Sequence, residues 1–239
     1  MYVGVDGCRI GWCAMALSPQ GDASVEVYPT FTALWDAWRA AQLILVDIPI
    51  GLKDDDPRER RCDLEARKVL GYPRGSSVFP APSRRSLDAE SYAEASELNR
   101  SSTGRGLSRQ SWAIVPKIRE VDRLLRNGAG ARSSIREVHP EVLFWALSGG
   151  SPILTRKKKP AGILERLQVL ESVYPGAEAV YSSALRRWKR SEVARDDLVD
   201  ALAAAVTGWI GGDRLQSLPG VQEADPRGLP MEMVYAMPG

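Results

Sequence analysis

The sequence predicts an α/β fold in which three antiparallel strands are followed by parallel strands, with helices packed against the sheet. Two short apolar runs at the start of the chain and an alternating segment at 23–29 predict the three antiparallel strands. An unbroken apolar segment at 43–46 is typical of a strand that is covered on both faces. A helix predicted over 194–209 carries small residues on one side, which would let it lie close to such a sheet.

The length and composition indicate one globular domain over 1–239. A chain of 239 residues can bury a sizeable core, and 44% hydrophobic and 26% charged residues argue against disorder. Asp6 and Arg9 interrupt the only candidate for a signal peptide, and no segment is long enough to span a membrane. The three cysteines and the single histidine lack metal-ligand spacing. We therefore expect a cytoplasmic protein without disulfides or a zinc site.

Basic residues are clustered, although the net charge is only +2. Each cluster could bind phosphate groups or simply face solvent. The four clusters lie at 58–61, 84–85, 156–159 and 186–190. Local clustering, and not the total charge, therefore leaves nucleic acid open as a partner.

The first 17 residues place a carboxylate, Asp6, between two apolar runs. Asp-Gly is typical of tight turns, so we expect Asp6 at the bend of a hairpin. Asp6 either shapes that turn or faces a charged group, because a buried carboxylate without a partner is costly to desolvate.

A second aspartate ends the buried strand that follows the hairpin region. A helix is predicted over 30–41, with Thr30 or Thr32 as its N-cap, and the next strand ends at Asp47 before a proline. Ligands gather at the carboxyl ends of parallel strands, so Asp47 would share an edge with Asp6 if their two strands are parallel neighbours. The alternative is that Asp47 only caps the following turn.

The segment at about 53–134 has no strand pattern and is predicted to be a helical insertion into the sheet domain. Its helices are expected over 62–71, over 91–99 and, after Pro116, within 112–125, with a proline-stiffened loop at 76–85. Ser77, Gln110 and Lys117 could line a substrate site, or could merely be solvated.

The segment at 135–147 is predicted to be a strand that leads through Pro140 into a helix. Glu137 and His139 would point the same way, because side chains alternate between the faces of a strand. Either could face the edge that holds the two aspartates. A lone histidine is most often structural, and no serine lies in a nucleophile turn, so we predict no catalytic triad.

Two further acids lie on the predicted helix at 194–209, which follows helices expected at 161–174 and 182–189. Asp197 and Asp200 are three residues apart and share a helix face with the small residues that follow them. Acids at a helix N-terminus commonly complement the helix dipole, but this does not account for Asp200, which lies deeper in the helix.

Four carboxylates, on Asp6, Asp47, Asp197 and Asp200, thus come from elements that can converge, with Glu137 in reserve. Packed together without cations, they would raise one another's pKa values. Oxygen ligands favour Mg²⁺ or Mn²⁺ over zinc. Two such ions held about 4 Å apart can activate water and stabilise the leaving oxygen of a phosphodiester. The pattern predicts a metal-dependent nuclease, with basic patches that hold the nucleic-acid backbone.

The order of the elements resembles the ribonuclease H-like fold, whose Holliday-junction resolvase branch places acids similarly. Five phrases of the sequence, in order, resemble a prokaryotic family called domain of unknown function 429, which is labelled a predicted ribonuclease H-like nuclease. The phrases are Gly4–Trp12, Asp47–Leu52, Ser76–Pro82, Glu137–Glu141 and Arg195–Leu202. The helical insertion has no counterpart in minimal ribonuclease H proteins, and would restrict or redirect the substrate.

The resemblance implies the roles of individual residues. Asp6, Asp47, Asp197 and Asp200 match the acids of the family and would hold Mg²⁺ or Mn²⁺ and act in catalysis. Glu137 or Glu141 would join them, and we expect Glu137 because it falls on the strand. Substrate would be bound by Arg9, Ser77, Gln110, Lys117 and Lys158. The implied partner is nucleic acid, either DNA or RNA, with no membrane, and a homodimer is left open.

Two other classes of function stay open. Actin-like or sugar-kinase-like nucleotide binders also begin with a strand, an aspartate and a glycine turn, but they normally need two copies of the fold, and this chain has no internal repeat. A non-catalytic scaffold that binds nucleic acid is the third class. The intact acids disfavour it, and a measurement of metal binding would distinguish it from the nuclease.

Overall fold

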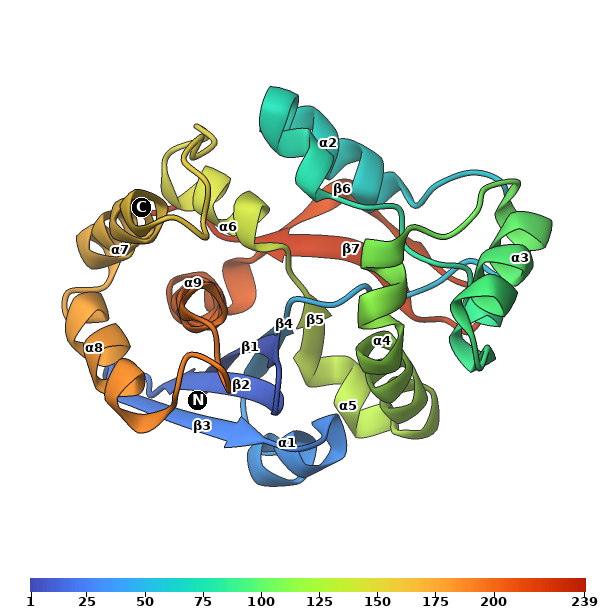
Figure 1. Cartoon of the computed structure of the whole chain (residues 1–239). Coiled ribbons are helices and arrows are strands. Elements are labelled where there is room, and N and C mark those ends of the chain that lie inside the picture. The colour runs from blue at the N-terminus through green and yellow to red at the C-terminus, as the bar shows by residue number, and fades with distance from the viewer.

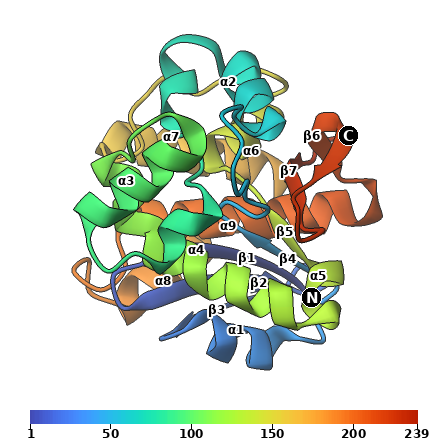
Figure 2. The same ribbon diagram turned by 90° about the vertical axis from the view of Figure 1, so that its right-hand side faces the viewer.

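The computed structural model describes the backbone of residues 1–239 and every side chain apart from that of residue 129. Its centre is a five-stranded mixed sheet in the order β3-β2-β1-β4-β5, with helices on both faces (Figures 1 and 2). The strands are β1 (Tyr2–Cys8), β2 (Gly11–Leu17), β3 (Ala23–Tyr28), β4 (Leu43–Val46) and β5 (Ile135–Glu137). The first three are antiparallel, and β4 and β5 run parallel to β1. The predicted mixed α/β sheet flanked by helices is confirmed.

The helices lie close to the predicted segments. They are α1 (Phe31–Trp38), α2 (Arg61–Arg74), α3 (Tyr92–Thr103), α4 (Arg109–Asn127), α5 (Ala129–Ser134), α6 (Pro140–Leu147), α7 (Pro160–Val173), α8 (Ala177–Arg187) and α9 (Arg195–Gly211). Short 3₁₀ turns lie at Gly75–Ser77, Arg84–Asp88 and Gly212–Arg214. Thr30 is the N-cap of α1, and its side chain accepts a hydrogen bond from the Ala33 amide. Among the described helices, none is long and apolar enough to cross a membrane.

The expectation that a helix starts after Pro116 is wrong. Helix α4 begins at Arg109 and continues through the proline. Ser108 caps the helix start, since its hydroxyl accepts a hydrogen bond from the Ser111 amide at 2.9 Å. Val115 and Ile118 lie on either side of the proline and are fully buried. Capping and burial of this apolar face together outweigh the hydrogen bond that proline cannot donate.

The position of Asp6 corrects a second expectation. Asp6 lies inside β1 and not at a bend, because the turn of the hairpin is formed by Arg9 and Ile10. Gly7 is also a strand residue, and a Cβ atom there would lie 2.6 Å from Cδ of Lys117. Gly7 therefore lies under the Lys117 side chain within the strand and does not form a turn.

The two faces of the sheet have separate hydrophobic cores. Val3 and Val5 of β1 pack toward α1 and α4, whereas Cys13 and Met15 of β2 pack toward α9. Side chains alternate along a strand, so Asp6 lies on the face opposite to that of Val3 and Val5. In Figure 1, α9 lies between this face and the outer helices α6 and α7, whereas α8 extends to the edge strand β3.

Helix α9 contacts β1 almost backbone to backbone. A Cβ atom at Gly4 would lie 2.1 Å from the Ala201 carbonyl oxygen and 2.2 Å from the Ala205 amide nitrogen. Only glycine leaves room for the helix at this crossing. The predicted close packing of the small-residue side of the helix is thus confirmed. Asp6 lies two residues along the same face, which brings it toward the N-terminal turns of α9.

A C-terminal hairpin, β6 (Gln216–Ala224) and β7 (Pro230–Tyr235), forms a second sheet that was not predicted. The pairing register shifts between Leu218 and Glu223, so the sequence lacks a continuous alternating pattern there. Met231 and Met233 of β7 are buried in the described core. The hairpin packs against α2 and α6 and so extends the core beyond the main sheet.

Candidate carboxylate site

Asp6 and Asp47 lie at the point where the parallel pairing of β1 and β4 ends. Val5 of β1 is paired with Val46 of β4, and the Asp47 amide donates a hydrogen bond to the Val5 carbonyl oxygen at 3.0 Å. Asp6 directly follows Val5, and Asp47 directly follows Val46. The condition set by the sequence, that their strands be parallel neighbours, is therefore met, and both aspartates lie at one sheet edge.

Helix α9 adds Asp197 and Asp200 to the same face of the sheet. Asp197 accepts a hydrogen bond from the Ala194 amide at 3.0 Å, so this carboxylate also caps the helix. Asp200 is almost completely buried. Its Oδ2 atom accepts from Lys157, whereas its Oδ1 atom is buried without a hydrogen-bond partner among the described residues. A buried carboxylate oxygen without a partner is unusual, and a bound cation would satisfy it.

The four aspartates interact electrostatically. Burial, reinforced by repulsion from the other three carboxylates, raises the pKa of Asp6 well above its ordinary range. Burial and the charge of Asp200, opposed by Lys157, raise the pKa of Asp47 to about 7. Burial raises the pKa of Asp197 to about 6, and it also raises the pKa of Asp200. The buried carboxylates thus disfavour one another's ionisation, and a bound cation would stabilise their charged forms.

Lys157 enters this group from the loop between α6 and α7. Its Nζ atom lies 2.5 Å from Oδ2 of Asp200. Its positive charge also lowers the pKa values of Asp6 and Asp47, against the effect of burial. The sequence identifies Lys157 only as a member of a basic cluster, because no local pattern indicates which lysine of 156–159 points toward the aspartates. Its position depends on the fold of the loop.

Both glutamates of the phrase Glu137–Glu141 are paired with arginines. The Arg60 guanidinium donates two hydrogen bonds of 2.8 Å to the Glu137 carboxylate, which also accepts from the Ile50 amide at 2.6 Å. Arg166 donates two hydrogen bonds, of 2.8 and 3.0 Å, to Glu141. Each of the two glutamates thus forms a buried ion pair with an arginine.

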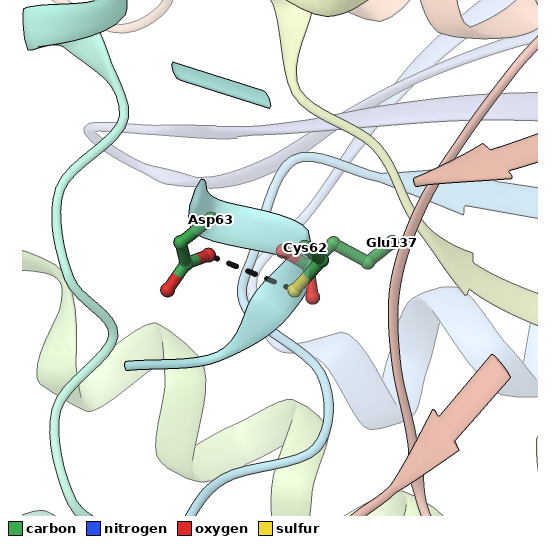
Figure 3. Close-up of side chains that lie close together, drawn as sticks. All are labelled: Cys62, Asp63 and Glu137. Carbon is green, nitrogen blue, oxygen red and sulfur yellow. Dashed lines mark hydrogen bonds between the residues drawn. The ribbon is translucent and has the colours of Figure 1, made fainter. Parts of the chain in front are cut away.

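A compact cluster near the site consists of Cys62, Asp63 and Glu137, which lie close together in Figure 3. Among the described residues, this is the only group of three or more potential metal ligands whose ligand atoms all lie within 4.8 Å of one another. The Arg60 guanidinium donates hydrogen bonds to both carboxylates and thereby supplies their counter-charge. We interpret this cluster as an internal ion-pair network. The four aspartates are less tightly grouped, but they offer a purely oxygen donor set, which suits a hard divalent cation.

A cavity of about 560 Å³ opens onto Asp6 and Asp47. Its walls include four of the five residues that were predicted to bind substrate, namely Ser77, Gln110, Lys117 and Lys158. The fifth, Arg9, lies exposed at the tip of the β1–β2 hairpin and does not line the cavity. The predicted insertion contributes α4 and the loop at 77–82 to the walls.

Lys117 and His139 are both partly desolvated in this cavity. Lys117 donates a hydrogen bond of 2.6 Å to the Gly11 carbonyl oxygen, and its ammonium lies 4.4 Å from the centre of the Trp12 ring. Burial lowers the pKa of Lys117. Burial also lowers the pKa of His139 to about 4, so this imidazole is neutral at neutral pH. His139 therefore contributes no positive charge to the cavity at neutral pH.

The basic runs are less exposed than the sequence suggested. Arg60 and Arg84 are almost fully buried. Arg84 forms ion pairs with Asp122, at 3.0 Å, and with Asp225. These two arginines stabilise the interior, because a buried guanidinium needs such partners, and they are not available for phosphate contacts.

The raised pKa of Asp47 predicts how stability depends on pH. The ordinary value of 3.8 applies to the unfolded chain, and the folded value is about 7. Between these values the folded state holds a proton that the unfolded state has lost, so the free energy of unfolding should fall as pH rises. We expect the Tm of the EDTA-treated protein to be a few degrees lower at pH 7.5 than at pH 5.5. The Asp47→Asn variant should show a weaker fall in the same thermal scans, and an equal fall would contradict this origin.

Residues 4–224 match the family described as Protein of unknown function (DUF429), and the chain belongs to that family. No curated protein and no solved structure matches the chain.

Proposed function

We propose that this member of the DUF429 family is a metal-dependent hydrolase of phosphodiester bonds in nucleic acid. The observation that carries the proposal is the convergence of the four aspartates. Asp6 and Asp47 directly follow the last paired residues of two adjacent parallel strands, and α9 brings Asp197 and Asp200 to the same face. The buried Oδ1 atom of Asp200 without a partner is a second, independent indication of a cation.

The order and direction of the strands support the proposal of a ribonuclease H-like fold. Its order is β3-β2-β1-β4-β5, with three antiparallel strands followed by two parallel ones. A late helix crosses the first strand and carries acids in its first turns. These features agree with the fold that the sequence resembles, in which such acids hold divalent ions. Because fold alone does not define chemistry, the proposal depends on the aspartates and not on the topology.

The chemistry follows from the charges. In the proposed site the four aspartates hold Mg²⁺ or Mn²⁺, which when bound would activate a water molecule and stabilise the leaving oxygen. Lys117 and Lys158 line the same cavity and would attract and orient the phosphate group. The walls contributed by α4 and by the loop at 77–82 would exclude bulk water, which strengthens these electrostatic interactions.

The cavity also indicates the size of the substrate. Its volume of about 560 Å³ lies within the range of roughly 300–1,000 Å³ that is typical of small-molecule sites. One or two nucleotide units of a single strand fit this volume, whereas a base-paired duplex is larger than the cavity. We therefore propose single-stranded nucleic acid, or a short phosphodiester, as the substrate class.

The test is a cleavage assay on end-labelled single-stranded, duplex and hybrid oligonucleotides of one sequence, and on a dinucleotide. With Mn²⁺ present, we expect the single strand to be cleaved at least about tenfold faster than the duplex, and we expect EDTA to abolish cleavage. Equal rates on single strand and duplex would refute the substrate class. Absence of cleavage on every substrate would refute the hydrolase itself.

A further inference from the structure

We propose that Lys157 permanently occupies one cation position of the carboxylate site, so that the site binds one divalent ion and not two. The proposal rests on the proposed function, because it concerns the same aspartates. It changes the expected mechanism, since the ammonium would supply the charge that a second metal ion supplies in a two-ion centre.

The contact between Lys157 and Asp200 is the first support. The Nζ atom lies 2.5 Å from Oδ2 of Asp200, so the ammonium is in direct contact with the carboxylate and donates a charge-assisted hydrogen bond to it. The Asp200 side chain is only 1% exposed, whereas the Lys157 side chain is 33% exposed. The lysine therefore reaches inward from the cavity, with its ammonium at the buried carboxylate and its stem toward the solvent.

The loop that carries Lys157 is firmly held, which is the second support. Arg166 donates a hydrogen bond of 3.0 Å to the Thr155 carbonyl oxygen. A Cβ atom at Gly162 would lie 2.1 Å from the Arg156 carbonyl oxygen, so the loop backbone lies directly against the start of α7. Arg166 is in turn paired with Glu141. The backbone directly before Lys157 is thus held by contacts at Thr155 and Arg156, which position the lysine.

The positive charge of Lys157 is the third support. Its ammonium lies against Asp200 and already supplies one positive charge to the group of aspartates. A second divalent ion would face both the first ion and the ammonium, and this repulsion opposes its binding. One oxygen of Asp200 is taken by the lysine, and Oδ1 remains without a partner among the described residues. This leaves Asp200 with one free oxygen for a single ion.

Stoichiometry tests the proposal without any assay of activity. Mn²⁺ is titrated by calorimetry into the metal-free wild-type protein, into Lys157→Met, and into Lys159→Met as the matched control. Lys159 is a neighbouring exposed lysine for which no ion pair is found among the described residues. We expect one ion for the wild type and for Lys159→Met, and two ions for Lys157→Met.

Electron paramagnetic resonance of the Mn²⁺-loaded wild type gives an answer even where Lys157→Met fails to fold. A spectrum of isolated ions supports the proposal, whereas a spectrum of a spin-coupled pair overturns it. Two ions in the wild type, or one ion in a folded Lys157→Met, would likewise overturn it. Binding of no ion at all by the wild type would refute the metal-dependent function, which is a different outcome from the failure of this inference.

Discussion

Asp6→Asn is expected to lower the rate of Mn²⁺-dependent cleavage by about 100- to 1,000-fold, the loss typical of removing a group that stabilises charge in a transition state. Asp6 lies inside β1, at the centre of the mutually repelling carboxylates. Asparagine keeps the shape of the side chain but removes the charge that would attract the ion. Single-turnover cleavage of a single-stranded oligonucleotide measures the effect.

The fold should survive this substitution. Removing one charge from a group of repelling carboxylates relieves repulsion, so the metal-free variant should unfold at the same temperature as the wild type or above it. Asp36→Asn is a matched control, since Asp36 is exposed on α1. It should cleave at the rate of the wild type. A folded Asp6→Asn variant that retains the full rate would remove Asp6 from the mechanism.

Arg60→Met is expected to destabilise the folded protein by about 3–5 kcal/mol, the cost typical of breaking a buried ion pair. The Arg60 guanidinium is paired with Glu137 at 2.8 Å and with Asp63 at 2.5 Å, and all three side chains are almost fully buried. Loss of the arginine would leave two buried carboxylates without a counter-charge. Unfolding in urea, followed by circular dichroism, measures the change in free energy.

Two further variants separate the ion pair from the general loss of a side chain. Arg61→Met removes an exposed arginine that contacts Glu223 at 3.3 Å, and should cost no more than about 1 kcal/mol. Arg60→Met combined with Glu137→Gln should recover part of the lost stability, because one uncompensated charge is removed. A single Arg60→Met variant within about 1 kcal/mol of the wild type would show that the network contributes little.

The strand that precedes Asp47 and the helix that carries Asp200 could both be predicted from local sequence patterns. The strand that ends at Asp47 is an uninterrupted apolar segment, and the small residues after Asp200 mark the side of the helix that meets the sheet. Both features depend on periodicity within one element. The parallel pairing of β1 and β4 then follows from the topology of an α/β sheet.

The buried ion pairs at and beside the site could not be predicted in this way. Lys157 and Asp200 are 43 residues apart, and Arg60 and Glu137 are 77 residues apart. Both pairs join a loop or a loop-to-helix junction to a regular element, and no sequence period specifies such a contact. Arginines and lysines in a run look alike in sequence, whether they face solvent or enter the core.

The misplaced bend at Asp6 has a related cause. Asp-Gly is typical of a turn, but the pairing of β1 with β2 continues through Asp6 and Gly7 to Cys8. Strand pairing thus overrides a local turn signal. Pro116 is a second case in which a local signal is overridden. It interrupts the helical pattern, but capping and burial of the apolar face maintain α4.

Binding of a divalent ion by the aspartates is the central claim, and Mn²⁺ calorimetry on the wild type and on the double variant Asp6→Asn with Asp47→Asn tests it most directly. Both proteins should first be shown to be folded by circular dichroism. We predict that the wild type binds Mn²⁺. The double variant lacks the carboxylates of Asp6 and Asp47 and should not bind it. Equal binding by both proteins, or no binding by the wild type, would contradict the account.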